Sequence, residues 1–222
     1  DTVIAEIDNG TALGSLTRKP EPYSQDLNYI FVGWNSKSDA TGNYWTNTSK
    51  VTGDIVLYAV YAEDVTSDLS LIECDNASKI YALTSSVSVA SVICADENKS
   101  FKGRLYGKGS TISVSGGGMF GKISGAYITD TFFSGSVSGE KTGIVAGTAE
   151  NSIIESISVT GSITASADNA TVGGVVGVLD NGSVIRNVSS KVLLSLSNGG
   201  NVSAGGIAGL VTGDSLITES YH

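Results

Sequence analysis

The sequence has very little histidine and cysteine, which removes most catalytic and metal-binding chemistry. Its one histidine is His222, and its two cysteines are Cys74 and Cys94, among 222 residues. Ser-His-Asp and Cys-His catalytic arrangements, and zinc sites with histidine ligands, all need an imidazole inside the fold. We therefore expect the chain not to be an enzyme, and we expect no cofactor and no metal site.

Positive charge and long apolar runs are also scarce. The chain has 13 Lys and Arg against 22 Asp and Glu, which gives a formal net charge of −9. So few basic side chains cannot neutralise a phosphate backbone, so nucleic acid is not an expected partner. No apolar run approaches the roughly 18 residues of a membrane span, and we expect no membrane insertion. With 41% hydrophobic residues, the chain has enough apolar side chains to fold.

Glycine, proline and tryptophan divide the chain into two parts. Only five of the 28 glycines precede residue 103, whereas both prolines and both tryptophans precede residue 62. The stretch at 63–69 is short, polar and without periodicity, as in a linker. We expect a small domain at 1–62, a linker at 63–69 and a second domain at 70–222.

Three segments of the first part have the composition of β-strands. Residues 2–7, 29–34 and 54–61 are rich in β-branched and aromatic side chains, and turn residues border them. Residues 13–18, between the first two segments, predict a short helix. The first part should therefore be a small and mainly β domain.

Two motifs of the first part carry a family resemblance. Phe31-Val-Gly-Trp34, followed by V-T-G-D-I-V-L-Y-A at 51–59, resembles the Listeria-Bacteroides repeat, the internalin B-repeat type of module. The resemblance covers residues 2–62 and implies a compact β-grasp-like module of bacterial surface proteins. Trp34 and Trp45 are expected to pack in its core, with sugar stacking as the alternative role.

Residues 118–222 contain a repeat with three short apolar segments in each unit. A glycine begins each unit at intervals of 25 to 32 residues, and the second apolar segment follows it after 10 or 11 residues. The four glycines are Gly118, Gly143, Gly174 and Gly206. Units of this size, with no room for a helix, predict a mainly all-β fold whose larger part is a right-handed parallel β-helix of about four to five coils. We expect its first coil at 70–117 and the repeats at 118–222.

The repeat also carries a family resemblance, over about residues 70–222. It resembles the GLUG-motif repeats and the non-catalytic N-terminal region of IgA-specific metallopeptidases of Gram-positive bacteria. The place that the family usually gives to asparagine in the second strand is filled here by Asp130, Glu155, Arg186 and Glu219. We expect these four to form a row of ion pairs on stacked coils. The alternative is a carboxylate cluster of a carbohydrate-active enzyme.

Equivalent apolar positions of the repeat predict two interior ladders, because stacked coils bring the same position together. The first expected ladder is Met119, Val145, Val176 and Ile207, and the second is Phe132, Ile157, Val188 and Tyr221.

The two cysteines lie in the expected first coil. In an exported chain, Cys74 and Cys94 either form a disulfide or fill space as two small buried side chains. The sequence leaves both interpretations open.

These observations and resemblances together predict a non-enzymatic segment of a bacterial cell-surface protein, acting as a stalk or an adhesive surface. We expect it to be extracellular, at a Gram-positive cell wall, and monomeric within a longer multidomain chain. A host glycan or a host protein is the partner expected where the segment binds one. One alternative is an adhesin with a defined site on the β-helix loops at 165–172 and 195–204. The other is a carbohydrate-active β-helix enzyme.

Overall fold

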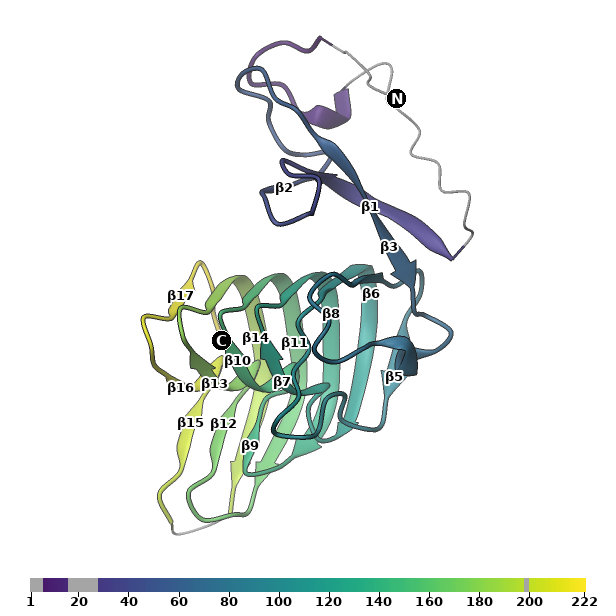
Figure 1. Cartoon of the computed structure of the whole chain (residues 1–222). Helices are drawn as coiled ribbons and strands as arrows, with labels where there is room; N and C mark the ends of the chain where they lie inside the picture. The colour runs from purple at the N-terminus through teal and green to yellow at the C-terminus, as the bar shows by residue number, and fades with distance from the viewer. Residues whose placement is uncertain (1–5, 16–27, 198–199) are drawn as a thin grey trace. The chain divides into compact units, whose positions relative to one another are not determined.

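The structure, a computed structural model, describes residues 6–15, 28–197 and 200–222. The chain divides into two compact units, Asp1–Glu63 and Asp64–His222. Nearly all of its regular structure is β, and the larger unit is built from parallel sheets (Figure 1). In the described part of the chain, neither of the helices has the length and apolar character needed to cross a bilayer.

The first unit contains an antiparallel sheet. Its central strand β1 (Tyr29–Asn35) pairs with β2 (Tyr44–Trp45) on one side and with β3 (Tyr58–Asp64) on the other. Strand β1 confirms the strand predicted at 29–34. Strand β3 begins at Tyr58, so the prediction that the strand begins at residue 54 is wrong.

The remaining predictions for the first unit fall partly outside the described residues. The predicted helix is a single 3-10 turn, η1 (Leu13–Ser15), and residues 16–18 are not described. Of the strand predicted at 2–7, residues 6 and 7 are not in a strand and the others lie outside the described residues.

The buried side chain of Asn35 holds the loop between β1 and β2 closed. Its amide nitrogen donates to the carbonyl oxygens of Ala40 and Gly42, at 3.3 and 3.1 Å. Its oxygen accepts from the backbone nitrogens of Lys37 and Gly42, at 2.9 and 3.0 Å. One buried polar side chain therefore satisfies the backbone of the turn.

The second unit begins with the short helix η2 (Leu69–Leu71) and continues as a series of strands. The strands are β4 (Ile80–Ala82), β5 (Val87–Val89), β6 (Arg104–Gly116), β7 (Phe120–Ser124), β8 (Tyr127–Ser138), β9 (Lys141–Thr142), β10 (Ala146–Glu150), β11 (Ile153–Ala165), β12 (Thr171–Gly173), β13 (Val176–Asp180), β14 (Val184–Leu196), β15 (Ser203–Gly205), β16 (Ala208–Val211) and β17 (Leu216–Thr218).

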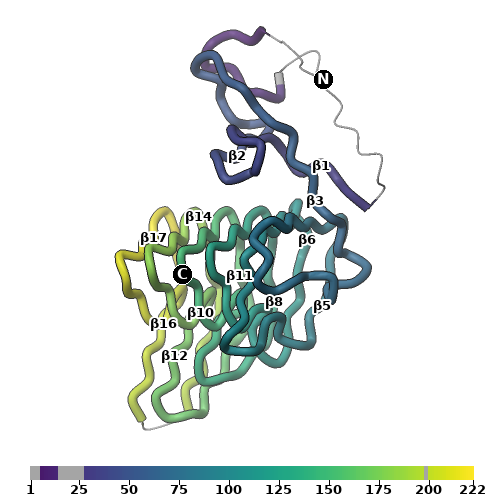
Figure 2. Tube along the Cα trace, in the orientation of Figure 1, coloured from purple at the N-terminus to yellow at the C-terminus, as the bar shows by residue number. Residues whose placement is uncertain are grey.

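These strands form three sheets in which neighbours are parallel (Figures 1 and 2). The longest has the order β17-β14-β11-β8-β6-β4, with β5 also paired to β6. The second has the order β16-β13-β10-β7, and the third β15-β12-β9. Successive repeats therefore contribute one strand to each sheet. The second and third apolar segments predicted in a unit, such as 128–132 and 135–137, lie together in one long strand, β8, so the prediction of a separate third strand there is wrong. The third sheet is instead formed by residues just before the next unit.

The pairing register corrects the first predicted ladder. One shared position, from β7 to β16, is held by Phe120, Ala146, Val176 and Ala208. Val176 therefore lies one position beyond Met119, Val145 and Ile207, with which it was grouped. Val175 takes its place, since its oxygen accepts from Val145 N at 3.0 Å and its nitrogen donates to Ile207 O at 2.8 Å.

The glycines that begin the units do not all share one position. Gly118, Gly174 and Gly206 stand two residues before the position just described, whereas Gly143 stands three residues before it. The predicted equivalence of Gly143 is therefore wrong by one residue. A Cβ atom on Gly143 would lie 2.3 Å from the carbonyl oxygen of Val175, so this glycine is required by a close approach of two backbones.

The second predicted ladder is wrong at both ends. Ile157 and Val188 pair with each other and are buried. Phe132 and Tyr221, however, are 52% and 64% exposed. Phe132 pairs with Ser158, one residue beyond Ile157. Because side chains alternate between the two faces of a strand, this shift of one residue places both aromatic rings outside.

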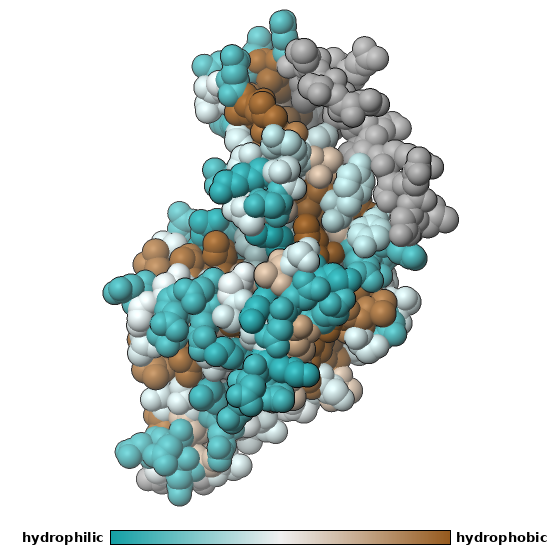
Figure 3. All heavy atoms as spheres, viewed as in Figure 1, coloured by the Kyte–Doolittle hydropathy of each residue, from teal (hydrophilic) through white to brown (hydrophobic). Residues whose placement is uncertain are grey.

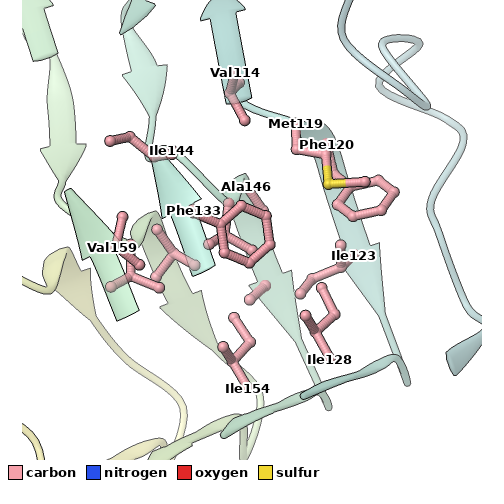
Figure 4. Packing of buried hydrophobic residues seen from close by; sticks show 14 of the residues in the cluster. Val114, Met119, Phe120, Ile123, Ile128, Phe133, Ile144, Ala146, Ile154 and Val159 are labelled. Atoms are coloured by element: carbon pink, nitrogen blue, oxygen red, sulfur yellow. The ribbon is translucent and has the colours of Figure 1, made fainter. Parts of the chain in front are cut away.

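A continuous apolar core fills the interior of the second unit, from Val65 to Val192. Near its beginning, the rings of Phe101 and Phe120 stack with centroids 4.7 Å apart. Figure 4 shows side chains of neighbouring strands meeting in this interior. On the face of the molecule seen in Figure 3, hydrophilic residues cover much of this unit and apolar residues form separate patches. Burial of this core is the main stabilising contribution available to the unit.

Candidate functional site

The charged row predicted from the sequence is present at its centre. Glu155 on β11 pairs with Arg186 on β14, and the Nε atom of Arg186 donates to Oε2 of Glu155. The side chain of Glu155 is 14% exposed and that of Arg186 is 49% exposed. The hydrogen bond to Glu155 raises the pKa of Arg186, which keeps the guanidinium charged.

A tyrosine completes the surroundings of the Glu155 carboxylate. The hydroxyl of Tyr127 donates to Oε1 of Glu155, so both carboxylate oxygens accept a hydrogen bond. Burial and the nearby Glu155 carboxylate raise the pKa of Tyr127 far above its usual range. The guanidinium of Arg104 lies 5.7 Å from the centroid of the Tyr127 ring, within reach of a cation-π interaction. We call Arg104, Tyr127, Glu155 and Arg186 the ion-pair cluster.

The chemistry open to the ion-pair cluster is limited. A general base needs a pKa near the operating pH, and a tyrosine whose pKa is raised does not meet that requirement. Burial also raises the pKa of the neighbouring Tyr106 to about 12. Glu155 already accepts from two donors, so the arrangement stabilises a charge and does not present a reactive group.

The two outer acids of the predicted row lie elsewhere, which corrects that prediction. Thr129 pairs with Glu155, and Thr218 pairs with Arg186. Asp130 and Glu219 each follow one of these threonines. They therefore stand one position further along the strand.

A bend recurs in each repeat at the residue that follows Thr129, Glu155, Arg186 or Thr218. Its residues all have left-handed backbones, with φ of 53°, 54°, 52° and 49° for Asp130, Ser156, Asn187 and Glu219. Asparagine and aspartate adopt this conformation more readily than other side chains that carry a Cβ atom. Between two of these residues, Nδ2 of Asn187 donates to Oγ of Ser156 at 3.1 Å. We call these four residues the bend row.

A second row runs beside the bend row on the outer surface of the same sheet. Its members are Phe132, Ser158, Ser189 and Tyr221, in successive repeats. We call them the aromatic row, because an aromatic ring stands at each end. Three members of the bend row, Asp130, Ser156 and Asn187, and all members of the aromatic row line a shallow groove of about 260 Å³.

Asp130 is the member of the groove with a perturbed ionisation. Burial raises its pKa above the ordinary value, and the charge of Lys108 offsets part of this effect. Lys108 belongs to an irregularity of β6 between Tyr106 and Ser110, where the register with β8 shifts.

Sequence reasoning did not find this groove. Phe132 and Tyr221 were assigned to the interior, and the shared bend was not recognised because its four residues have little in common as side chains. The signal in the sequence was Asn187, since asparagine favours a left-handed backbone.

Cys74 and Cys94 form a disulfide, with Cα atoms 5.8 Å apart. Further contacts beside this disulfide connect the segment after Cys74 to the segment after Cys94. The backbone nitrogen of Asp75 donates to the oxygen of Ser100 at 2.7 Å, and the Lys102 ammonium lies 3.1 Å from the Asp75 carboxylate. The disulfide and these bonds fasten the irregular segments at the start of the second unit.

Within residues 6–15, 28–197 and 200–222, no group of three or more His, Cys, Asp or Glu side chains is arranged to hold a metal ion. No curated protein and no solved structure matches the chain. Residues 5–60 match the family model of the Listeria-Bacteroides repeat domain, which confirms the resemblance found in the first part of the sequence.

Proposed function

We propose that the chain is a non-enzymatic segment of a bacterial cell-surface protein, in which the second unit is a parallel β-helix that acts as a stalk or an adhesive surface. The Listeria-Bacteroides repeat domain at 5–60 supports the setting, together with the resemblance of the second unit to GLUG-motif repeats. That resemblance also supports an extracellular position at a Gram-positive cell wall.

The observation that carries the stalk role is the stacking of the second unit. Every strand from β7 to β16 lies in one of three parallel sheets, and each strand pairs with its equivalents in adjacent repeats. A stack of this kind grows in one direction and is held by contacts between neighbouring repeats. Such a structure is a spacer whose length depends on the number of repeats.

The charges of the second unit support a structural role in place of a catalytic one. Ion pairs join Lys79 to Glu73 and Lys122 to Glu150, each at 2.8 Å. Glu155 is engaged by Arg186 and Tyr127. These acidic side chains are therefore engaged in ion pairs and hydrogen bonds with neighbouring segments.

The location is tested with antibodies against residues 64–222, applied to intact and to permeabilised cells of the bacterium that encodes the chain. We expect labelling of intact cells, and labelling only after permeabilisation would contradict the proposal. The absence of catalysis is tested separately on a panel of polysaccharides. Cleavage of a polysaccharide that disappears in the Glu155→Gln variant would show that the alternative of a carbohydrate-active enzyme is correct.

A second candidate is an adhesin with a binding site on the loops of the β-helix. The loop at 166–170 and the loop that contains Gly200 follow equivalent strands of successive repeats. A Cβ atom on Gly200 would lie 2.6 Å from Oδ1 of Asp168, so these loops lie side by side. Exchange of both loops for short Gly-Ser turns should abolish binding to a glycan array or to host matrix proteins if this candidate is correct.

A further inference from the structure

We infer that the groove between the bend row and the aromatic row binds a neutral, extended oligosaccharide. This goes beyond the stalk role, which needs no ligand, and it places a site on the sheet surface and not on the loops. The inference rests on the two exposed rings, the interval between the rows of polar groups and the charge of the groove.

The backbones that carry the two rings are held in place by strand pairing. Phe132 lies within β8 and pairs with Ser158. Tyr221 is anchored through its backbone, which donates to Val188 O at 3.0 Å and accepts from Ser190 N at 2.9 Å. The apolar faces of a sugar ring can pack on such exposed rings, because little conformational entropy is lost when a fixed aromatic side chain binds.

Serines and the apolar side chains of Ile157 and Val188 line the groove between the rings. Two serines, Ser158 and Ser189, separate Phe132 from Tyr221 in the aromatic row. Adjacent strands lie about 4.8 Å apart, so the three steps place the rings roughly 14 Å from each other. A linear ligand of several units is therefore needed to contact both rings at once.

The bend row supplies hydrogen-bonding groups at the same interval along one side of the groove. The carboxylate of Asp130 accepts, and the Ser156 hydroxyl and the Asn187 amide both donate and accept. These residues are exposed. Successive pyranose units of an extended chain follow one another at about the spacing of neighbouring strands, so each unit meets an equivalent polar position. An extended peptide rises about 3.3 Å per residue and does not keep this match.

The charge of the groove selects a neutral ligand. Asp130 is the charged residue among those that line the groove, and the charge of Lys108 acts on it. The whole chain carries a net charge of −9. Phosphorylated or uronic-acid chains would approach like charges, which disfavours their association.

The test uses the whole chain and isothermal titration calorimetry with defined probes. The neutral probes are the hexamer and the dimer of β-1,4-linked glucose, and the hexamer of β-1,4-linked N-acetylglucosamine. The charged probes are a hexamer of α-1,4-linked galacturonic acid and a lysine-rich decapeptide. The variants are Phe132→Ala and Tyr221→Ala. The control is Leu193→Ala, which removes a side chain that is 76% exposed on the same sheet outside the groove.

We expect at least one neutral hexamer to bind, and the glucose dimer to bind more weakly because it cannot reach both rings. Each aromatic substitution should lower the affinity roughly threefold to tenfold, while Leu193→Ala leaves it unchanged. Phe132→Tyr keeps a ring and should restore binding, which separates loss of the site from misfolding. Lack of binding of all neutral hexamers at 10 mM, an equal affinity of the aromatic variants and wild type, or a preference for galacturonate or for the peptide would each overturn the inference.

Discussion

Arg186 stands directly beside Glu155 on the neighbouring strand and donates from Nε to its carboxylate. The same carboxylate accepts from the hydroxyl of Tyr127. Because the Glu155 side chain is largely covered and the Arg186 side chain is half exposed, the two partners are not equivalent. Removal of Arg186 leaves a covered charge with one donor fewer, which costs more than the loss of an exposed pair.

Arg186→Gln should therefore lower the free energy of unfolding by about 1 to 2 kcal/mol at low salt. The loss should shrink as salt is added, because salt screens the part of the interaction that is exposed. Chemical denaturation at two ionic strengths measures both effects. Lys191→Gln, an exposed residue of the same strand, is the matched control. A double-mutant cycle with Glu155→Gln that gives no coupling energy would contradict a stabilising pair.

The disulfide should contribute measurably to the stability of the second unit. It closes a segment with a sequence separation of 20 residues, and loop closure of this size contributes about 3 kcal/mol. Replacement of Cys74 and Cys94 by serine should lower the Tm by roughly 6 to 12 °C for a domain of this length. A reducing agent should lower the Tm of the wild type by a similar amount and leave the double variant unchanged. A wild-type Tm that does not respond to reduction would contradict this prediction.

Val176 is a sensitive probe of the interior. It is fully buried and pairs with Ala146 and Ala208 on the adjacent strands. Val176→Asp would bury an unpaired carboxylate, which costs about 3 kcal/mol or more. Leu193→Asp places the same charge at an exposed site and should change the Tm little. A Val176→Asp variant with the wild-type Tm would show that this register is wrong.

The apolar segments and the glycines of the repeat show how much of this fold can be predicted from the sequence. The first two apolar segments of each unit predicted the strands of two sheets, because hydrophobic spacing reports directly on burial. The short strands β9, β12 and β15 of the third sheet were not predicted. The sequence was less informative about which residues of successive repeats occupy equivalent positions. Gly143 was aligned with Gly118 because both are glycines that begin a unit, and a Cβ atom on either would lie 2.3 Å from a backbone oxygen. The pairing of Phe120 with Ala146 shows that Gly143 stands three residues before the shared position and Gly118 only two.

The candidate site was predictable only in part for a related reason. The pair of Glu155 and Arg186 follows from the repeat spacing, and the register confirms it. The bend row has no common side chain, since aspartate, serine, asparagine and glutamate all adopt its left-handed backbone. Because the sequence does not reveal this bend, it predicts Phe132 and Tyr221 in the interior, whereas both side chains are exposed in the structure.

Asp130 gives the fold a pH dependence whose sign can be derived. Burial raises its pKa in the folded state, with partial compensation from Lys108. A carboxyl group with a raised pKa binds its proton more tightly when folded. Its favourable contribution is therefore complete below the unfolded pKa and is lost as the pH rises through the folded pKa. At pH 7 ionisation of Asp130 should therefore lower the stability of the fold, and only slightly, because the side chain is largely exposed.

Asp130→Asn should therefore raise the Tm at pH 7, by about 1 °C or more, and the gain should disappear as the pH falls below about 4. Thermal melts between pH 3 and pH 7 measure this difference. Asp214→Asn makes the same exchange at another left-handed residue, with φ of 57°, and measures the backbone contribution alone. A gain of equal size at every pH would assign the effect of Asp130→Asn to the backbone and not to the charge.

The boundary between the two units predicts that each folds without the other. In the first unit, Glu63 still pairs with Tyr29 of β1. Asp64 instead accepts from Thr66 N and from Thr84 Oγ1, both at 3.0 Å within the second unit, and the apolar core of that unit begins at Val65. We therefore place the cut between Glu63 and Asp64, where the two compact units meet along the chain.

We expect fragments 1–63 and 64–222, expressed separately, to give dispersed NMR spectra whose peaks overlay on those of the whole chain. The larger fragment should melt cooperatively, because it retains its complete core and its disulfide. The smaller fragment should be marginal, since a domain of about 60 residues buries a smaller share of its surface. A single transition of the whole chain, with neither fragment folded alone, would mean that the two units are one cooperative structure.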